Sequence, residues 1–373
     1  MSDLPPDLVE EILSRVPATT LTRLRSTCKK WNALLNNRRF TEKHFREASK
    51  QSHALLWKDF RVCPMRINFN VAAPSIEFKS VLSLKYSHNN SELVDIAKVV
   101  HCDGLLLCTT KDGRLVVWNP CLGETRWIQL EADYEKHTRF ALGYQNNKSC
   151  RSYKILRFSK SYLTPNHMGV VSKIYELTSD SWRVLLDKVA LNYYLLESEN
   201  GVSLKGNTYW FALDDDTSFL LGFDFTTERF NRFCLPSTEN LDMIVLSVFR
   251  EEKLSVSHQK FLTSKMDIWM TNRIDNEAAL SWKKSFSVEF KILSTYHYFS
   301  FCNSFLIDKE KKVVVCTSTT IVRDKNMVSI IGEDSAYYTE IPSESTNWSC
   351  SPCIFNYVPS LVQIQQYRDK IEE

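Results

Sequence analysis

Cysteine pairs and acidic runs are the residue groups in this sequence that could hold a metal ion or carry redox chemistry. One C-x-x-C motif runs from Cys350 to Cys353, and residues 214–216 form the run DDD. A structural zinc site needs a second cysteine pair or two histidines, and no Cys or His follows Cys353. Upstream ligands such as His101 and Cys102 are compatible with the sequence. We favour the structural interpretations, which are packed thiols beside a strand and a solvated hairpin turn.

Common motifs of covalent catalysis are absent from the sequence. It has no G-x-S-x-G, no P-loop and no G-x-G-x-x-G, and its eight histidines are scattered. The formal net charge of +3 is close to neutral for 373 residues, whereas a nucleic-acid-binding protein usually carries a concentrated basic stripe. No run approaches the roughly 18 apolar residues of a membrane span. We therefore expect no enzymatic activity, no cofactor or metal, no nucleic-acid partner and no membrane insertion.

The first residues and the cysteines indicate a compartment. The opening stretch MSDLPPDLVEE is acidic and lacks the apolar core of a signal peptide. Eleven cysteines stand without the dense, regular spacing of a secreted disulfide scaffold. We expect a protein of the nucleus, the cytoplasm or both, with mostly buried free thiols.

Residues 4–48 show the periodicity of three short helices. Apolar residues from Leu8 to Val16 recur every three or four positions, with Pro5 and Pro6 at the helix start and Pro17 at its end. The stretch LRSTCKKWNALL (24–35) then places Leu24, Cys28, Trp31 and Leu35 on one helical face, and a third helix begins at Thr41 and carries Phe45 and Ala48. So small a segment buries too little surface to be stable alone. Part of its apolar surface is therefore expected to face something else.

From residue 49 to residue 373 the pattern changes to short β-strands. Runs rich in Val, Ile, Leu and aromatic residues alternate with Asp, Asn, Gly and Ser turns. A weak repeat places an aromatic residue after a polar turn at Trp127, Trp182, Phe230 and Trp282, which are 55, 48 and 52 residues apart. This period is typical of one four-stranded blade of a β-propeller. The sequence thus predicts a mainly β protein, with a helical domain over residues 1–48 and a β-propeller-like domain over 49–373; a large β-sandwich is the alternative.

The helical segment resembles an F-box. That pattern begins Leu-Pro, continues with an acidic residue and Leu, an apolar pair and an apolar–Pro stop, and ends in a Leu-Arg…Cys-Lys-x-Trp helix. Its positions are matched here by Leu4, Pro5, Asp7, Leu8, Ile12, Leu13, Val16, Pro17, Leu24, Arg25, Cys28, Lys29 and Trp31.

The β-region resembles the type 1 F-box-associated domain of a large plant family, which is regarded as propeller-like. The matching stretches include CDGLLLC (102–108), LVVWNPCLGETRWI (115–128), SDSWRVL (179–185), GVSLKGNTYWFA (201–212), LLGFDFTTERF (220–230), IWMT (268–271) and FNYVPSLVQI (355–364). The two resemblances together span almost the entire chain.

The resemblance implies a substrate receptor of an SCF-type ubiquitin ligase. The F-box of such a receptor binds a Skp-family adaptor, which connects through cullin to the RING subunit, and the second domain holds the target protein. The expected adaptor-binding residues are Leu4, Pro5, Leu8, Ile12, Leu13, Leu21, Leu24, Cys28 and Trp31, and some of these must also form the small internal core. Trp31 is the favoured interface anchor, because buried Trp often dominates binding energy. Pro5 and Pro17 are expected to shape the backbone.

Two other functions stay open from the sequence. An F-box protein could work outside the ligase as an adaptor-bound scaffold, and a propeller enzyme could assemble a site from distant loops. The target protein cannot be identified from the sequence. The segments SYLTPNHMG (161–169) and ADYEKHT (132–138) are candidate exposed recognition loops, although both also suit ordinary polar connectors.

Overall fold

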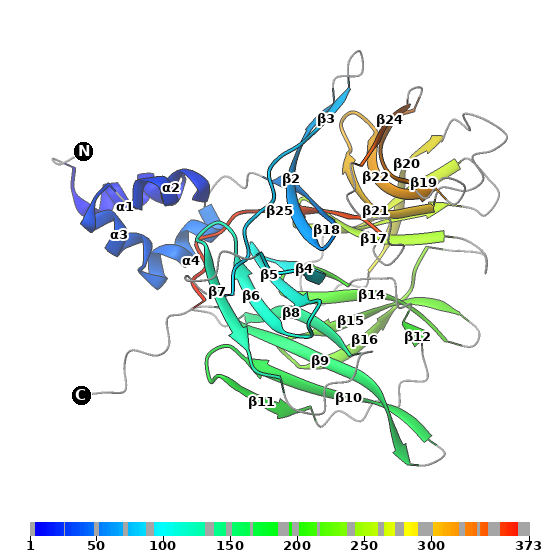
Figure 1. The fold of residues 1–373 in the computed structure, drawn as a ribbon, viewed down its shortest axis with the longest axis horizontal. Coiled ribbons are helices and arrows are strands. Elements are labelled where there is room, and N and C mark those ends of the chain that lie inside the picture. The colour runs from blue at the N-terminus through cyan, green and yellow to red at the C-terminus, as the bar shows by residue number, and fades with distance from the viewer. Residues whose placement is uncertain are drawn as a thin grey trace.

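A computed structural model gives the fold, in which the described residues form four helices packed beside a large ring of β-sheets (Figure 1). The structure describes residues 4–25, 27–47, 52–69, 74–86, 93–130, 138–146, 151–164, 167–185, 194–195, 201–214, 217–236, 243–259, 265–272, 280–289, 301–320, 325–333, 336–341 and 351–364. Within these ranges, no helix is long and apolar enough to cross a membrane.

The N-terminal segment forms four helices, where the sequence predicted three. They are α1 (Pro6–Ser14), α2 (Ala18–Arg25), α3 (Lys29–Leu35) and α4 (Arg38–Glu47). The single helix expected around LRSTCKKWNALL is broken into α2 and α3, because Cys28 has an extended backbone with φ of −147°. The Thr27 hydroxyl donates to the Leu24 carbonyl at 2.7 Å. Local bonds of this kind from Ser and Thr compete with helix continuation.

The final helix also begins earlier than the sequence pattern predicted, at Arg38 rather than at Thr41. Asn37 precedes it, and its side-chain oxygen accepts a hydrogen bond from the Arg39 amide at 2.9 Å. Asn is a preferred N-cap residue, so the signal for this start was present in the sequence. Ala48, expected on this helix, lies outside the described residues.

In the described part of the chain, the strands form six antiparallel sheets, which we call blades 1 to 6. Blade 1 contains β4 (Ile96–Cys102), β5 (Leu105–Thr110), β6 (Leu115–Asn119) and β7 (Glu124–Ile128), and blade 2 contains β8 (Arg139–Asn146), β9 (Arg151–Thr164), β10 (His167–Glu176) and β11 (Ser181–Val184). Blade 3 contains β12 (Tyr194–Leu195), β13 (Val202–Leu204), β14 (Asn207–Leu213), β15 (Ser218–Asp224) and β16 (Arg229–Phe233). Blade 4 contains β17 (Met243–Phe249), β18 (Lys253–Gln259), β19 (Lys265–Thr271) and β20 (Trp282–Glu289).

The remaining strands complete the ring. Blade 5 contains β21 (Phe301–Asp308), β22 (Val313–Thr320), β23 (Lys325–Ile331) and β24 (Ala336–Glu340). Blade 6 joins β25 (Cys353–Tyr357) to β1 (His53–Lys58), β2 (Arg61–Asn68) and β3 (Ser75–Phe78). Contacts among β4, β8, β13, β17, β21 and β25 join blades 1 to 6 in order. A core cluster that contains Tyr357 of β25 with Ile96 and Val99 of β4 joins blade 6 to blade 1. The fold is therefore a six-bladed β-propeller, and the alternative of a β-sandwich is wrong.

The repeat seen in the sequence is confirmed as the blade repeat. Trp127, Trp182, Phe230 and Trp282 lie on β7, β11, β16 and β20, each the last strand of its blade. Two of these indoles also tie neighbouring blades together. The Trp182 Nε1–H donates to the Gln129 carbonyl at 3.0 Å, and the Trp282 Nε1–H donates to the Cys234 carbonyl at 2.8 Å. In blades 2 and 4 the repeated aromatic therefore ties the blade to the one before it.

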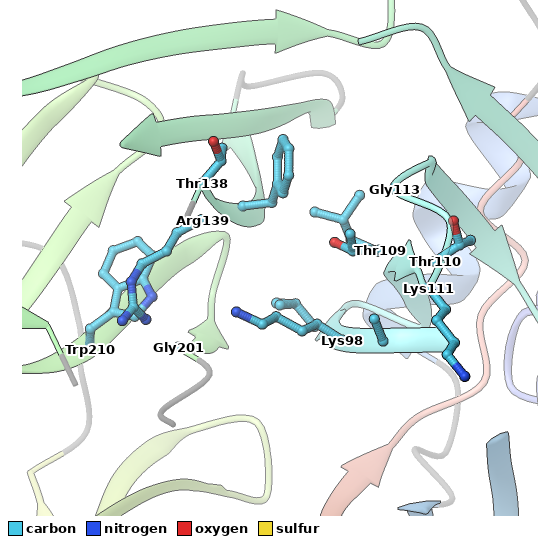
Figure 2. Close-up of a pocket in the computed structure, with 13 residues that line it drawn as sticks. Lys98, Thr109, Thr110, Lys111, Gly113, Thr138, Arg139, Gly201 and Trp210 are labelled. Atoms are coloured by element: carbon cyan, nitrogen blue, oxygen red, sulfur yellow. The ribbon is translucent and has the colours of Figure 1, made fainter. Parts of the chain in front are cut away.

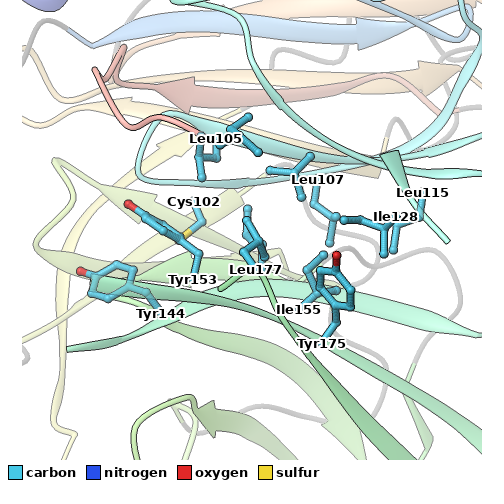
Figure 3. Close-up of a cluster of buried hydrophobic side chains, with 13 residues drawn as sticks. Cys102, Leu105, Leu107, Leu115, Ile128, Tyr144, Tyr153, Ile155, Tyr175 and Leu177 are labelled. Carbon is cyan, nitrogen blue, oxygen red and sulfur yellow. The ribbon is translucent and has the colours of Figure 1, made fainter. Parts of the chain in front are cut away.

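Apolar packing between blades provides the core of the ring. The middle strand β5, with the sequence LLLCTT, is buried along almost its whole length, because other strands or blades cover both of its faces. Figure 3 shows one core cluster, where Cys102, Leu105 and Leu107 of blade 1 meet Tyr153 and Tyr175 of blade 2. Similar clusters join the other blades. Burial thus leaves mainly polar residues for the outermost strands, such as RFNRF in β16.

The ring is closed by pairing the two ends of the β-region. His53 pairs with Tyr357 and Trp57 pairs with Cys353, so that β25 supplies one strand of a blade whose other strands come from the N-terminal side. The segment after β25 then runs from the ring toward the helices (Figure 1). It passes so close to the β4–β5 hairpin that a Cβ on Gly104 would lie 2.6 Å from the Val358 carbonyl oxygen. Gly104 also has a φ of +79°, which favours glycine.

Candidate functional site

Helix α1 carries a row of apolar side chains that the described part of the molecule leaves bare. Leu4 precedes the helix, and Leu8 and Ile12 follow at intervals of four residues, which places the three side chains on one side. Their exposed fractions are 40%, 51% and 44%. Pro5 and Pro6 start the helix as the sequence predicted, since Pro suits the first turn. This bare row is the first candidate for a partner-binding site.

The opposite side of α1 packs into a small core of the helical module. Leu13 and Leu21 are buried there with Ala18, Leu35 and Phe40. Polar contacts join α1 to α4, because the Ser14 hydroxyl donates to Glu47 at 2.7 Å. His44 on α4 is buried, and its Nε2 lies 2.7 Å from the Val16 carbonyl oxygen. Burial lowers the pKa of His44, which favours the neutral ring.

The nine residues predicted for adaptor binding fall into three groups, a division that the sequence left open. Four are exposed, namely Leu4, Pro5, Leu8 and Ile12; three are half-buried, namely Leu24, Cys28 and Trp31; and Leu13 and Leu21 are buried. Trp31 packs partly against the module's own core, beside Leu24. Leu24 and Cys28 do not share one continuous helix, because α2 ends at Arg25 and α3 begins at Lys29. The Arg25 Nε–H donates to Asn32 Oδ1 at 2.8 Å and joins the two helices.

The helical module is held against the propeller through the segment after β25. Leu361 is buried in the helical core together with the half-buried Cys121 and Leu122 of the β6–β7 turn. The Gln363 side-chain amide donates to the Leu35 carbonyl at 3.2 Å and to Asn36 at 2.9 Å. The same segment is fixed to blade 1, since Asn119 Nδ2 donates to the carbonyls of residues 360 and 362 at 3.1 and 2.7 Å.

Arg151, at the start of β9, forms a second link between the helices and the ring. Its guanidinium lies 3.8 Å from Glu42 of α4 and 3.7 Å from Asp103 of the β4–β5 hairpin. The guanidinium carbon stands 3.3 Å from the centre of the Phe45 ring, and the Arg151 amide donates to Glu42 at 3.1 Å. Ion pairs are worth most where water is excluded, and the Arg151 and Asp103 side chains are only 11% and 8% exposed. No signal in the sequence predicted this contact.

Where the structure describes them, the other sequence candidates do not assemble into a chemical site. Burial raises the pKa of Cys353 to about 11, and Cys350 lies outside the described residues. His101 Nε2 accepts a hydrogen bond from the Gly104 amide at 3.1 Å, and burial lowers its pKa to about 4. In the ranges described above, no three His, Cys, Asp or Glu side chains gather in a way that could hold a metal ion.

The predicted loops and the acidic run can be placed in part. Asp214 accepts a hydrogen bond from the Thr217 amide at 2.7 Å, within the turn that joins β14 to β15, and residues 215 and 216 lie outside the described residues. Of segment 161–169, residues 161–164 and 167–169 belong to the paired strands β9 and β10. Of segment 132–138, only Thr138 is described, at the entrance to β8.

Four helices with a bare apolar row, docked on a six-bladed propeller, define a propeller protein with an N-terminal helical module. The profile of the F-box domain matches residues 1–43, and that of the F-box associated β-propeller domain matches residues 53–364. The chain therefore belongs to the family of F-box proteins with an F-box-associated propeller domain.

Relatives from Arabidopsis thaliana agree over nearly the full length. F-box only protein 9 is 72% identical over 370 residues, covering 99% of this chain and 98% of the relative. An F-box/kelch-repeat protein is 53% identical over 371 residues, covering 98% of both chains. An F-box protein is 53% identical over 335 residues, covering 86% of this chain and 94% of the relative. The chain thus belongs with plant F-box proteins, as the resemblance implied.

Proposed function

We propose that this F-box protein is the substrate receptor of an SCF-type ubiquitin ligase. Its helical module would bind a Skp-family adaptor, and the adaptor would connect it through cullin to the RING subunit. The observation that carries the proposal is the bare row of Leu4, Leu8 and Ile12 on a module that matches the F-box profile. Burying a fully exposed side chain of this kind contributes about 1.5–3 kcal/mol. These three side chains are 40–51% exposed, so covering the row would add part of that amount at each position.

The exposure of each residue supports a different role in the proposed contact with the adaptor. Leu8 and Ile12 would contact the adaptor directly, with Leu4 at the edge of the interface. Trp31 and Leu24 are half-buried and would offer their remaining surface beside this row. Leu13 and Leu21 would act indirectly, by holding α1 in place from the core of the module. Any effect of substituting these two residues would therefore come with unfolding of the helices.

A receptor of this kind performs no covalent chemistry. Its contribution is to hold a target lysine close to the charged conjugating enzyme, which raises the effective concentration of the reacting groups. A fixed position of the adaptor-binding row relative to the propeller supports this role. Leu361, Gln363 and Arg151 supply the contacts that fix the helical module on the ring.

The proposal is tested by measuring how tightly the Leu8→Asp variant and the Val184→Asp variant bind the adaptor. Val184 lies on β11 and is 56% exposed, so it is a matched control for placing a carboxylate on an exposed apolar residue. We expect Leu8→Asp to weaken adaptor binding at least tenfold, about 1.4 kcal/mol, and Val184→Asp to leave it unchanged. Absence of adaptor binding by the unsubstituted full chain at micromolar concentration would refute the proposal.

A role as an adaptor-bound scaffold outside the ligase is the second candidate, and it shares the same adaptor contact. The two roles differ in whether cullin joins the complex. Reconstitution with adaptor, cullin and RING subunit separates them: a receptor forms the complete assembly, whereas a scaffold binds the adaptor without cullin.

A further inference from the structure

A cavity of about 230 Å³ lies where the inner strands of five blades meet. Its wall includes residues of β4, β13, β17, β21 and β25, so the cavity lies on the axis of the propeller. It shares Val100 and Gly201 with a neighbouring pocket of about 390 Å³ between blades 1, 2 and 3 (Figure 2). Since a cavity of about 150 Å³ holds benzene, the axial cavity has room for one six-membered ring with a short substituent.

Much of the wall of the axial cavity is apolar surface that the protein does not cover. The middle strand β5 is buried along almost its whole length, whereas only Ile244 is buried among the residues of β17. The half-buried side chains of Val245, Leu246 and Val248 line the cavity. Phe355 of β25 adds a half-buried aromatic ring. An apolar molecule in the cavity would remove this surface from water, which is favourable.

His101 supplies a hydrogen-bond donor to the same wall. Its Nε2 accepts a hydrogen bond from the Gly104 amide at 3.1 Å, so the neutral imidazole must carry its proton on Nδ1. Burial lowers the pKa of His101 to about 4, which keeps the imidazole neutral near pH 7. Within the described part of the chain, Nδ1 has no hydrogen-bond acceptor. A ligand that carries an acceptor would supply it.

Two aromatic rings of blade 6 hold the imidazole in a fixed orientation. Its centre lies 6.2 Å from that of the stacked Phe355 ring and 5.5 Å from that of the Tyr357 ring, which it meets edge-on. The Gly104 amide fixes the far side of the imidazole. A donor that is already oriented loses little conformational freedom when a ligand binds.

Other polar groups of the wall are already used within the protein. The Ser247 hydroxyl donates to the Phe305 carbonyl at 2.8 Å, and the Ser304 hydroxyl accepts from the Ile354 amide at 2.7 Å. Nδ1 of His101 differs from these two hydroxyls, because it has a proton to donate and no acceptor among the described residues.

The charge of the wall favours a neutral ligand. Glu251, in the turn after β17, is the only Asp, Glu, Lys or Arg among the described lining residues, and it takes part in a further contact within the protein. A carboxylate in the cavity would therefore find no lysine or arginine, and burying an unpaired charge is costly. An ammonium would have to compete with the contact that Glu251 already makes.

We propose that the axial cavity binds a small neutral molecule with an apolar ring and a carbonyl oxygen. The carbonyl oxygen would accept the hydrogen bond from Nδ1 of His101, and the apolar ring would pack against Phe355 and the apolar side chains of β17. Water would satisfy the donor but would leave the apolar wall uncovered, whereas such a molecule does both. The site shares no residue with the bare row on α1, so it does not depend on the proposed adaptor contact.

Saturation-transfer NMR with the full chain and three probes of nearly the same shape tests the site. Benzamide is neutral and has a carbonyl oxygen, benzoate is an anion and benzylamine is a cation. We expect benzamide to bind with a dissociation constant below about 1 mM and each charged probe to bind at least tenfold more weakly. Equally tight binding of either charged probe, or no binding of benzamide in this range, would overturn the proposal.

Variants of the donor locate the bound probe. His101→Gln keeps an oxygen that can accept from the Gly104 amide but removes the donor at the position of Nδ1, and it should weaken benzamide binding at least fivefold. His101→Asn keeps an amide N–H close to the position of Nδ1 and should retain more of the binding. Equal benzamide binding by the unsubstituted chain and His101→Gln would overturn the role of His101.

Thr138→Val is the matched control in the neighbouring pocket. The Thr138 hydroxyl lines that pocket and has no hydrogen-bond partner among the described residues, so it is a competing donor for a carbonyl group. Thr138→Val keeps the side-chain shape and should leave benzamide binding unchanged. Loss of binding in Thr138→Val but not in His101→Gln would place benzamide in the neighbouring pocket and overturn the assignment to the axial cavity.

Nitrogen-15 NMR of the unsubstituted chain with labelled histidine tests the donor without any substitution, in case His101→Gln lowers stability. We expect the proton of His101 on Nδ1 in the free protein and a shift of the Nδ1 resonance when benzamide is added. A proton on Nε2, or an Nδ1 resonance that does not respond to benzamide, would overturn the proposal.

Discussion

The helical module and the propeller treat their apolar residues in opposite ways. The propeller buries its large apolar side chains between blades, and its exposed exceptions are scattered at Val81, Tyr86 and Val184. One of these, Tyr86, packs edge-on against Trp127 at 4.9 Å. The helical module is far smaller, yet it carries the other three large exposed apolar residues of the described chain, on a single side of α1. A bare apolar row on an otherwise folded module supports the proposed adaptor-binding surface, whereas scattered exposed residues need no such explanation.

The largest effect on stability is expected from a Leu→Asp substitution inside the core of the helical module. Leu21 is fully buried, and Leu21→Asp combines a lost apolar side chain with a buried carboxylate. We expect the free energy of unfolding of the module to fall by about 4 kcal/mol or more. Hydrogen exchange of the amides of α1 to α4, followed by mass spectrometry, measures this loss. Protection equal to that of the unsubstituted chain would show that Leu21 is not part of the module's core.

The next largest effect is expected at the contact between the two regions. Arg151→Met leaves Glu42 and Asp103 without their arginine, and breaking a buried pair costs about 3 kcal/mol. Urea unfolding of the full chain measures the change. In a double-mutant cycle, Glu42→Gln should add little once Arg151 is replaced.

Arg250 provides the matched control for that substitution. It pairs with Glu310 at 2.7 Å, but both side chains are more than half exposed. Arg250→Met should therefore change stability by less than about 1 kcal/mol. A cost as large as that of Arg151→Met would mean that burial does not distinguish the two arginines.

A smaller effect on the stability of the helical module is expected from pH. The pKa of His44 is lower in the folded helical module than the ordinary value of 6.5, so the unfolded module binds more protons. The stability that neutral His44 contributes to the module should be complete above pH 6.5 and should decrease as the pH falls below 6.5. Hydrogen exchange between pH 7.5 and 5 should show this loss in α1 to α4.

His44→Gln serves as the control for the pH effect, because Gln can still donate to the Val16 carbonyl. The pH dependence of exchange in α1 to α4 should become shallower in this variant. The propeller has its own titrating group in His101, whose pKa is about 4 in the folded protein. The propeller should therefore also lose stability as the pH falls below 6.5. If the pH dependence of exchange in α1 to α4 did not change after His44→Gln, a group other than His44 would be responsible for it.

The smallest effect is expected on the bare row itself. Leu8 is half exposed, so Leu8→Asp should change the melting temperature of the isolated chain very little, because surface substitutions usually stay within about 0.5 kcal/mol. Differential scanning calorimetry measures this. A large loss of stability would show that Leu8 supports the fold, which would remove the distinction between the two sides of α1.

The sequence predicted the parts of this fold that have a local signal. Trp127, Trp182, Phe230 and Trp282 mark the last strands of four consecutive blades, since each follows a polar turn at a regular distance. The typed positions from Leu4 to Trp31 predicted the F-box, which the family profile confirms. The sequence did not predict the number of blades. The pairing of β25 with β1 joins residues about 300 positions apart, and no residue pattern in either strand identifies the strand with which it pairs.

The sequence predicted which segment contains the candidate site, but it did not predict which of its residues are exposed. Periodicity alone does not separate Ile12, which is exposed, from its neighbour Leu13, which is buried, because the division depends on where α4 packs. Arg151 was missed because its partners Glu42 and Asp103 are distant in sequence. The axial cavity was also missed, since its wall is assembled from five blades.

The closing strand also sets an order of events during synthesis. Residues 351–364 supply β25, Leu361 and Gln363, and they leave the ribosome after the four helices and all the other described strands. Until then blade 6 lacks one strand, and the helices lack the contacts with Leu361 and Gln363 that hold them against the ring. Ring closure through contacts so distant in sequence is expected to be slow. A chain interrupted before this segment could expose Leu8 and Ile12 but could not present them at the fixed distance from the propeller that the finished protein has.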